Sequence, residues 1–135
     1  MPFVLDASVA ASWAFQDEDH PAADLAFEHF RSDEAVAPSL LWFELRNILV
    51  VSERRKRLGQ ADTTAFLREF SRLPLRVDRS PDELEVLRLA RSYQLSVYDA
   101  AYLELALREG LPLATLDTTL AKAAQAEGVR LIGVT

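Results

Sequence analysis

Two aspartates stand directly after short apolar runs, at positions where a carboxylate could do chemistry. Asp6 follows residues 3–5, and Asp117 follows residues 113–116. If both runs are strands of one parallel sheet, both acids project at its carboxyl edge, where the ligand sites of such sheets lie. Each acid alone is explained equally well as a helix N-cap, because aspartate accepts hydrogen bonds from exposed helix amides.

Glu44 lies on the apolar face of a predicted helix. At 100° per residue, the apolar side chains within about 60° of it are those of Leu40, Leu41, Ile48 and Val51. An ionised, unpaired carboxylate in such a setting costs several kcal/mol, so Glu44 needs a partner or a function. We favour a functional role over a structural one, in which Asn47 or a buried arginine would be the partner.

Asp99 repeats this pattern on a predicted helix over residues 97–109. The apolar side chains that share its face are those of Tyr102, Leu103 and Ala106. The structural alternative is a capping box that begins at Ser96, in which the acid bonds back to the amide of the cap residue. For Asp99 taken alone, the two interpretations are equally good.

Convergence of these four acids would create a metal site. Like charges a few Å apart in a protein interior need a cation or raised pKa values. Carboxylate oxygen suits Mg²⁺ or Mn²⁺, and the chain has no cysteine to favour a softer metal. A hard dication binds phosphate oxygen, orients a water for in-line attack and offsets charge on the leaving oxygen. The chemistry predicted for the four acids is therefore phosphodiester hydrolysis.

Short apolar strands alternate with helices along the whole chain. The predicted strands cover residues 3–5, 35–37, 75–77, 111–116 and 129–132, and the predicted helices cover residues 7–15, 21–31, 38–57, 62–73, 81–93, 97–109 and 118–127. Strands that are apolar on both faces belong to a parallel sheet covered by helices on both sides. We predict an α/β fold, a three-layer α/β/α sandwich with a mainly parallel sheet of about five strands.

Two helix ends carry local signals. Gly59 is predicted to end the helix over residues 38–57, because glycine adopts the left-handed conformation that closes helices. Ser80 is predicted to cap the helix that follows it, with Pro81 in the first helical position and Glu83 completing a capping box.

Composition narrows the class of protein. A chain of 135 residues that is 50% hydrophobic is expected to form one domain over residues 1–135. A net charge of −6 argues against wholesale electrostatic adhesion to nucleic acid or an anionic membrane. The apolar start lacks the basic residues of a secretory signal, and no run of eighteen apolar residues occurs, so we expect a cytoplasmic protein without a membrane span. Neither GxGxxG nor a P-loop can be written from its four glycines.

Four segments together resemble the PIN-domain ribonucleases of the VapC toxin type. They read VLDASV at residues 4–9, PSLLWFELRN at residues 38–47, SVYDAAYL at residues 96–103 and LATLD at residues 113–117. The resemblance runs over nearly the whole chain, in a specific order and spacing. It implies a single PIN-like α/β/α domain and metal-dependent endonucleolytic cleavage of RNA. It also implies the toxin role in a type II toxin–antitoxin pair, inhibition by a small cognate antitoxin, and a homodimer.

The resemblance also assigns site residues. The acidic quartet around Mg²⁺, with Mn²⁺ as the substitute, would be Asp6, Glu44, Asp99 and Asp117. Asp6 and Asp99 would be the foremost direct ligands, and the hydroxyls of Ser8 and Thr115 would support the ligands from behind. Some relatives carry a further acid two residues after the last member of the quartet, where this chain has Thr119. That extra ligand is therefore absent here.

One dense basic run and two tryptophans complete the candidate surface features. The run is Arg54, Arg55, Lys56 and Arg57. It could contact RNA phosphate, but cations also suit the carboxyl end of a helix, which is a sufficient structural explanation. Trp42 is predicted on the helix face opposite Glu44, and it could mark an antitoxin or dimer contact. Trp13 could belong to the core or to such a surface.

Two other functions stay open at this point. A phosphoacceptor receiver-type signalling domain has a similar length, a parallel sheet and strand-end acids that bind Mg²⁺. It usually needs a lysine beside the acids, however, and Lys56 and Lys122 both fall within predicted helices. A catalytically silent PIN-like protein-binding domain is the second alternative, and it would bind no divalent metal.

Overall fold

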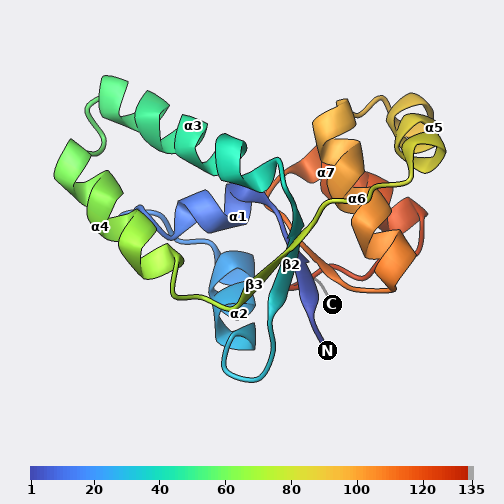
Figure 1. The fold of residues 1–135 in the computed structure, drawn as a ribbon, viewed down its shortest axis with the longest axis horizontal. Coiled ribbons are helices and arrows are strands. Elements are labelled where there is room, and N and C mark those ends of the chain that lie inside the picture. The colour runs from blue at the N-terminus through green and yellow to red at the C-terminus, as the bar shows by residue number, and fades with distance from the viewer. Residues whose placement is uncertain (134–135) are drawn as a thin grey trace.

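The computed structural model describes residues 1–133 and has a parallel sheet between two groups of helices (Figure 1). The strands are β1 (Phe3–Leu5), β2 (Ala35–Pro38), β3 (Leu75–Asp78) and β4 (Leu113–Ala114). Their order in the sheet is β3-β2-β1-β4, and all three neighbouring pairs are parallel. The central strand is therefore β1, which ends directly before Asp6.

The helices divide between the two faces of the sheet. They are α1 (Ala7–Ser12), α2 (Pro21–His29), α3 (Leu41–Arg54), α4 (Gln60–Phe70), α5 (Glu83–Tyr93), α6 (Val97–Glu109) and α7 (Thr118–Ala126). Figure 1 shows α1 to α4 on one side and α5 to α7 on the other. The predicted α/β/α sandwich is thus confirmed. None of these helices is long and apolar enough to cross a membrane.

The alternation of side chains along β1 supplies both cores. Phe3 and Leu5 pack with residues of α1 to α4, whereas Val4 packs with residues of α5 to α7. All three are fully buried. Because both faces of the strand are covered, its sequence is continuously apolar rather than alternating, which is the signal that predicted a parallel sheet.

Over residues 1–133 the sheet has four strands, and the fifth predicted strand is reduced to a single bridge. Leu131 pairs in parallel with Leu113. The Leu113 amide donates to the Arg130 carbonyl at 2.9 Å, and the Ile132 amide donates to the Leu113 carbonyl at 3.0 Å. β4 itself is only two residues long, so it offers little edge on which residues 129–132 could extend.

The predicted role of Gly59 is wrong. The helix α3 ends at Arg54, and Lys56 takes the left-handed conformation that closes it, with φ of 61°. The Arg57 amide donates to the Ser52 carbonyl at 2.9 Å, which completes this helix end. Gly59 instead begins α4, where its amide donates to the Asp62 carboxylate at 2.9 Å.

The predicted start of α5 is displaced by two residues. Asp82, rather than Ser80, is the N-cap, and its carboxylate accepts a hydrogen bond from the Glu85 amide at 3.3 Å. Pro81 therefore precedes the cap instead of occupying the first helical position. Aspartate caps as well as serine does, so the two candidate caps could not be separated by residue type.

Gln94 closes α5 in a left-handed conformation, with φ of 53°, and the next amide, that of Leu95, donates to the Ala90 carbonyl at 3.0 Å. A side chain in this conformation is strained relative to glycine by roughly 1 kcal/mol. We expect Gln94→Gly to raise the free energy of unfolding by about 1 kcal/mol in urea denaturation. Gln94→Ala should bring no such gain. A glycine variant no more stable than the wild type would contradict this helix end.

Candidate active site

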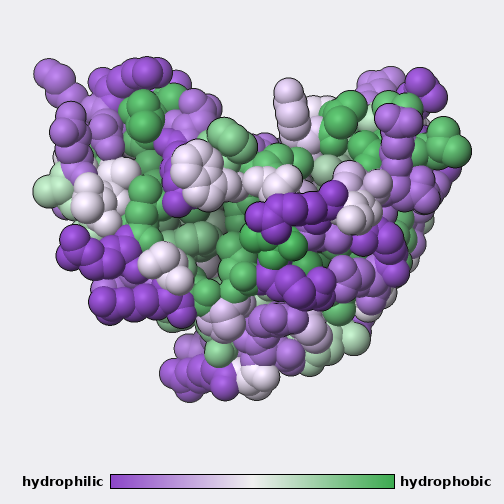
Figure 2. All heavy atoms as spheres, in the orientation of Figure 1, coloured by the Kyte–Doolittle hydropathy of each residue, from purple (hydrophilic) through white to green (hydrophobic). Residues whose placement is uncertain are grey.

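The four predicted acids lie at the amino-terminal ends of four helices. Asp6 is the N-cap of α1 and Asp117 is the N-cap of α7, while Glu44 and Asp99 lie in the first turns of α3 and α6. In Figure 1 the starts of α3, α6 and α7 come together between the two groups of helices, at the carboxyl end of β1. Figure 2 shows the surface hollowed between these groups. Helix amino termini favour negative charge, so each acid is placed where the backbone supports it.

Asp6 is the most buried of the four, with 4% of its surface exposed. Its Oδ1 accepts hydrogen bonds from Ser8 Oγ at 2.6 Å and from the Val9 amide at 3.1 Å, and its Oδ2 accepts one from the Thr115 hydroxyl. Burial raises the pKa of Asp6 to about 6, although these three bonds favour the ionised form. Asp6 thus caps α1, and burial destabilises the ionised form of its carboxylate.

The hydroxyls of Ser8 and Thr115 join the first and last parts of the site. Ser8 Oγ also accepts the Leu116 amide at 2.9 Å, and Thr115 Oγ1 accepts the Asp117 amide at 3.0 Å. Each hydroxyl therefore donates to Asp6 and accepts from the segment that leads to Asp117. This arrangement fixes the positions of two acids that are more than a hundred residues apart in the chain.

Glu44 is paired with Tyr102, a partner that the sequence analysis missed. Tyr102 Oη donates to Glu44 Oε1 at 2.6 Å, and only 1% of Tyr102 is exposed. Burial raises the pKa of Glu44, the tyrosine bond lowers it, and the charge of Asp99 raises it further. The partner is neither Asn47, which is exposed, nor an arginine. Tyr102 was predicted only as an apolar neighbour of Asp99; its phenol was the signal that could have identified it.

Asp99 interacts electrostatically with all three of the other acids. Burial raises its pKa, the charge of Asp117 raises it further, and the Ser96 hydroxyl lowers it. The charge of Asp99 in turn raises the pKa values of Asp6 and Glu44. The Asp99 amide also donates to Ser96 Oγ at 3.0 Å, so Ser96 caps α6, which is one of the two bonds of the capping box in the structural alternative. Ser96 therefore caps the helix, and Asp99 also interacts through its charge with the other acids.

Asp117 combines the same two features. Its Oδ1 accepts a hydrogen bond from the Leu120 amide at 3.0 Å, which caps α7. Its charge raises the pKa of Asp99. Each of the N-cap interpretations offered for the strand-end acids is therefore correct.

The pocket suits a hard dication by its donor set, although its side chains are not arranged around one. Within residues 1–133, none of the ion pairs involves any of the four acids, so their repulsion is not relieved by arginine, lysine or histidine. In the same described part, no three acidic or histidine side chains come close enough to hold a metal ion. The donors are all oxygen, the type that Mg²⁺ and Mn²⁺ prefer. Rotation of these side chains toward a common centre would be required.

The basic run lies at the opposite end of α3 from Glu44. Arg57 is already paired, with its Nη2 at 3.0 Å from Glu18 and 3.5 Å from Asp17. In the part of the chain that the structure describes, Arg54, Arg55 and Lys56 have no ion-pair partner. Three of the four predicted phosphate contacts are therefore free to bind an anion.

The two tryptophans have different surroundings. Trp13 is partly buried, its indole Nε1 donates to the Ala23 carbonyl at 3.0 Å, and its ring packs edge-on against Phe27 at 5.3 Å. Trp42 is 57% exposed and its neighbour Phe43 is 71% exposed, directly before Glu44. Trp42 is therefore the surface residue of the two, as its position opposite Glu44 predicted.

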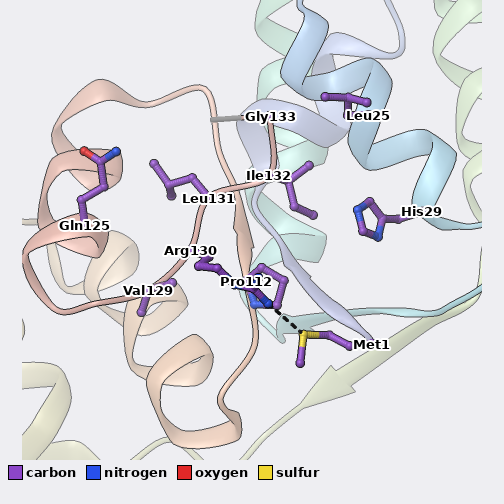
Figure 3. Close-up of a pocket in the computed structure, with 10 residues that line it drawn as sticks. All are labelled: Met1, Leu25, His29, Pro112, Gln125, Val129, Arg130, Leu131, Ile132 and Gly133. Carbon is purple, nitrogen blue, oxygen red and sulfur yellow. Dashed lines mark hydrogen bonds between the residues drawn. The ribbon is translucent and has the colours of Figure 1, made fainter. Parts of the chain in front are cut away.

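A separate cavity lies at the other edge of the sheet and does not belong to this site. Figure 3 shows its lining, which includes Met1, Pro112 and Ile132. Met1 and Pro112 precede β1 and β4, so the cavity is at the amino ends of the strands. None of the four acids lines it.

Comparison with known proteins places this geometry in context. A family model described as PIN domain matches residues 3–126. Among solved structures, PAE2754 from Pyrobaculum aerophilum is similar, with a TM-score of 0.73 and 25% identity over 98% of this chain and 90% of that chain. VapC20 from Mycobacterium tuberculosis, described as a sarcin-ricin loop cleaving toxin, has a TM-score of 0.61 and 16% identity over 90% of this chain and 94% of that one. No curated protein matches the sequence significantly.

The raised pKa of Asp6 makes stability depend on pH. Folded Asp6 holds its proton up to about pH 6, whereas an unfolded aspartate loses it near 3.8, so the free energy of unfolding should fall as the pH rises between these values. In EDTA, we expect Asp6→Asn to be more stable than the wild type at pH 7 by about 1–3 kcal/mol. The advantage should shrink toward pH 4 in urea denaturation. An advantage independent of pH would contradict the burial of an ionised Asp6.

Proposed function

The chain belongs to the PIN domain family, and from this premise we propose that it is a Mg²⁺-dependent endoribonuclease, the toxin of a type II toxin–antitoxin pair. The family match and the VapC neighbour support a nuclease. The observation that carries the proposal is that Asp6, Glu44 and Asp99 lie at the amino-terminal ends of three helices and that none of them is paired with a cation of the described chain. The charge of Asp99 also raises the pKa values of Asp6 and Glu44. We further propose that residues 1–135 form a single PIN-like domain that acts in the cytoplasm.

Asp6 and Asp99 are proposed as the direct metal ligands, completed by Glu44 and Asp117. When bound by these oxygens, Mg²⁺ or Mn²⁺ would supply an activated water for attack on phosphorus and positive charge beside the leaving oxygen. The resident carboxylates also repel an RNA phosphate, and the same dication would offset their charge where the phosphate to be cleaved enters the site.

Hydrogen bonds leave some carboxylate lone pairs available for this role. Asp6 Oδ1 accepts two bonds, whereas Oδ2 accepts one, from Thr115. One lone pair of Oδ2 is therefore left to bind a metal. Tyr102 occupies only Oε1 of Glu44, which leaves Oε2 for the pocket. Ser8, Thr115 and Tyr102 act as positioning residues, because each fixes an acid without needing to touch substrate.

The proposed partners are an RNA substrate, a small antitoxin protein and a second copy of the chain. VapC20 is described as cleaving the sarcin-ricin loop, which supports RNA as the substrate class. Large exposed apolar side chains flank the site: Phe43 and Trp42 precede Glu44, and Val97 and Tyr98 precede Asp99. Exposed apolar groups gathered in this way favour a protein interface beside the site, and we assign it to the homodimer or the antitoxin.

The family match favours a nuclease over the receiver-type signalling domain. A receiver-type domain usually needs a lysine beside its acids. Lys122 lies on α7 and Lys56 follows the end of α3, so their positions do not favour the signalling domain. A catalytically silent PIN-like domain is distinguished by metal binding. In isothermal titration, uptake of Mn²⁺ supports the nuclease, and failure to bind either Mn²⁺ or Mg²⁺ supports the silent domain.

Asn substitutions test the proposed ligands. Incubation with a mixed RNA pool should give discrete cuts with Mg²⁺ and none in EDTA, and mapping the cut ends would define the target. We expect Asp6→Asn and Asp99→Asn each to lower the cleavage rate at least about 100-fold, because each removes a negative ligand. Both variants should stay folded by circular dichroism.

Asp24→Asn provides the matched control, since Asp24 is exposed on α2 away from the pocket. Its cleavage rate should equal that of the wild type. Metal-dependent cleavage retained by both the Asp6 and Asp99 variants would reject the assignment of these ligands.

A further inference from the structure

A groove lies between α1 and α3. Its volume is about 350 Å³, and its lining includes Ser8 of α1 and Arg55 at the carboxyl end of α3. Asn47 and Val51 of α3 also line it. The Ser8 hydroxyl in this groove is the one that donates to Asp6 Oδ1 at 2.6 Å. The groove is therefore next to the site where cleavage is proposed.

Arg55 lies on the same face of α3 as Glu44. Eleven residues separate them, which at 100° per residue brings Arg55 to within about 20° of Glu44 around the helix axis and about 16 Å along it. Arg54 is about 80° away from that face by the same geometry, and it does not line the groove. A strand of nucleic acid that lies along α3 from Glu44 would therefore reach Arg55 after a few nucleotides.

The charges along the groove single out Arg55. Arg57 also lines the groove, but Glu18 and Asp17 bind its guanidinium, which stacks 4.3 Å above the Phe15 ring. Glu18, the one acid of the lining, is in turn engaged by Arg57 at 3.0 Å. Within residues 1–133 no acid is paired with Arg55. Arg55 is thus an uncompensated cation in the lining of this groove.

We propose that this groove binds one strand of RNA, with Arg55 contacting a backbone phosphate and Asn47 contacting the strand between Arg55 and the carboxylate pocket. The inference rests on the nuclease function proposed above. It reduces the candidate phosphate contacts of the basic run to Arg55 alone. Single-stranded RNA fits because positive side chains in a groove follow the backbone of one strand and proteins recognise RNA mostly in single-stranded segments. A phosphate contact a few nucleotides from the cut holds the strand against the repulsion of the acids.

Binding without cleavage tests the proposal. The probe is a fluorescein-labelled pool of random 12-nucleotide single-stranded RNA, titrated with the full chain in EDTA and followed by fluorescence anisotropy. We expect Arg55→Ala to raise Kd about 5- to 10-fold at low salt and to reduce the slope of log Kd against log salt by about 0.7, the value for one phosphate contact on a single strand. Arg55→Lys should restore the slope, and Asn47→Ala should raise Kd about 3-fold without changing it.

Arg54→Ala is the matched control, since it removes the same charge one residue away and outside the groove. It should change Kd less than 2-fold, and thermal melting should show all variants folded. Equal effects of Arg54→Ala and Arg55→Ala would overturn the proposal, because the run would then act only through its summed charge. Unchanged RNA binding by Arg55→Ala would also overturn the proposal. An acidic protein segment would then be the ligand to test in the groove.

Failure of the groove is distinguishable from failure of the nuclease. If the wild type cleaves no RNA with Mg²⁺ but Arg55→Ala still weakens binding relative to Arg54→Ala, the groove is supported and the nuclease is not. If the wild type cleaves RNA and the two arginine variants bind alike, the nuclease stands and the groove assignment falls.

Discussion

Repulsion between carboxylates in a partly desolvated pocket is the interaction on which the site depends. Asp6 is buried at the end of the central strand, and the charge of Asp99, at the start of α6, raises its pKa. Neither acid has a basic partner among the described residues, so the fold holds negative charge together at a cost in stability. A stable protein keeps such a cost only where the charges have a function, and attracting a dication is the function that their chemistry supports.

The architecture maintains this repulsion by joining distant segments through polar side chains. The Thr115 hydroxyl reaches Asp6 across the β1–β4 pair, and Ser8 returns a bond to the Leu116 amide. Tyr102 connects the two groups of helices, because it lies on α6 and bonds Glu44 on α3. The helix amino termini add donors around the acids. The site is therefore held by the sheet edge and by hydroxyl groups, and its opening depends on how the two helical groups are spaced.

The features predicted from sequence are those determined by local pattern. The strand and helix sequence, the bounds of α6, and the inward position of Asp99 follow from periodicity and from a cap at Ser96. The pairing of Glu44 with Tyr102 did not follow, because it joins residues 58 positions apart and depends on how α3 crosses α6. Glu104 shows the same limit. It is opposite Asp99 on α6 yet 2% exposed, because Arg108 binds it at 2.7 Å and also reaches Asp78. The start of α5 was misplaced because Ser80 and Asp82 cap a helix equally well. The end of α3 was misplaced because Lys56 takes the left-handed conformation although Gly59, three residues later, favours it more strongly.

Crystals of the wild-type protein grown with Mn²⁺ would test the central claim directly, through the anomalous scattering of the ion. An anomalous peak is expected within about 2.0–2.3 Å of carboxylate oxygens of both Asp6 and Asp99, with the side chains of the pocket turned toward it. A pocket in which a guanidinium or ammonium group lies between these acids, or an ion bound only elsewhere on the molecule, would contradict the claim.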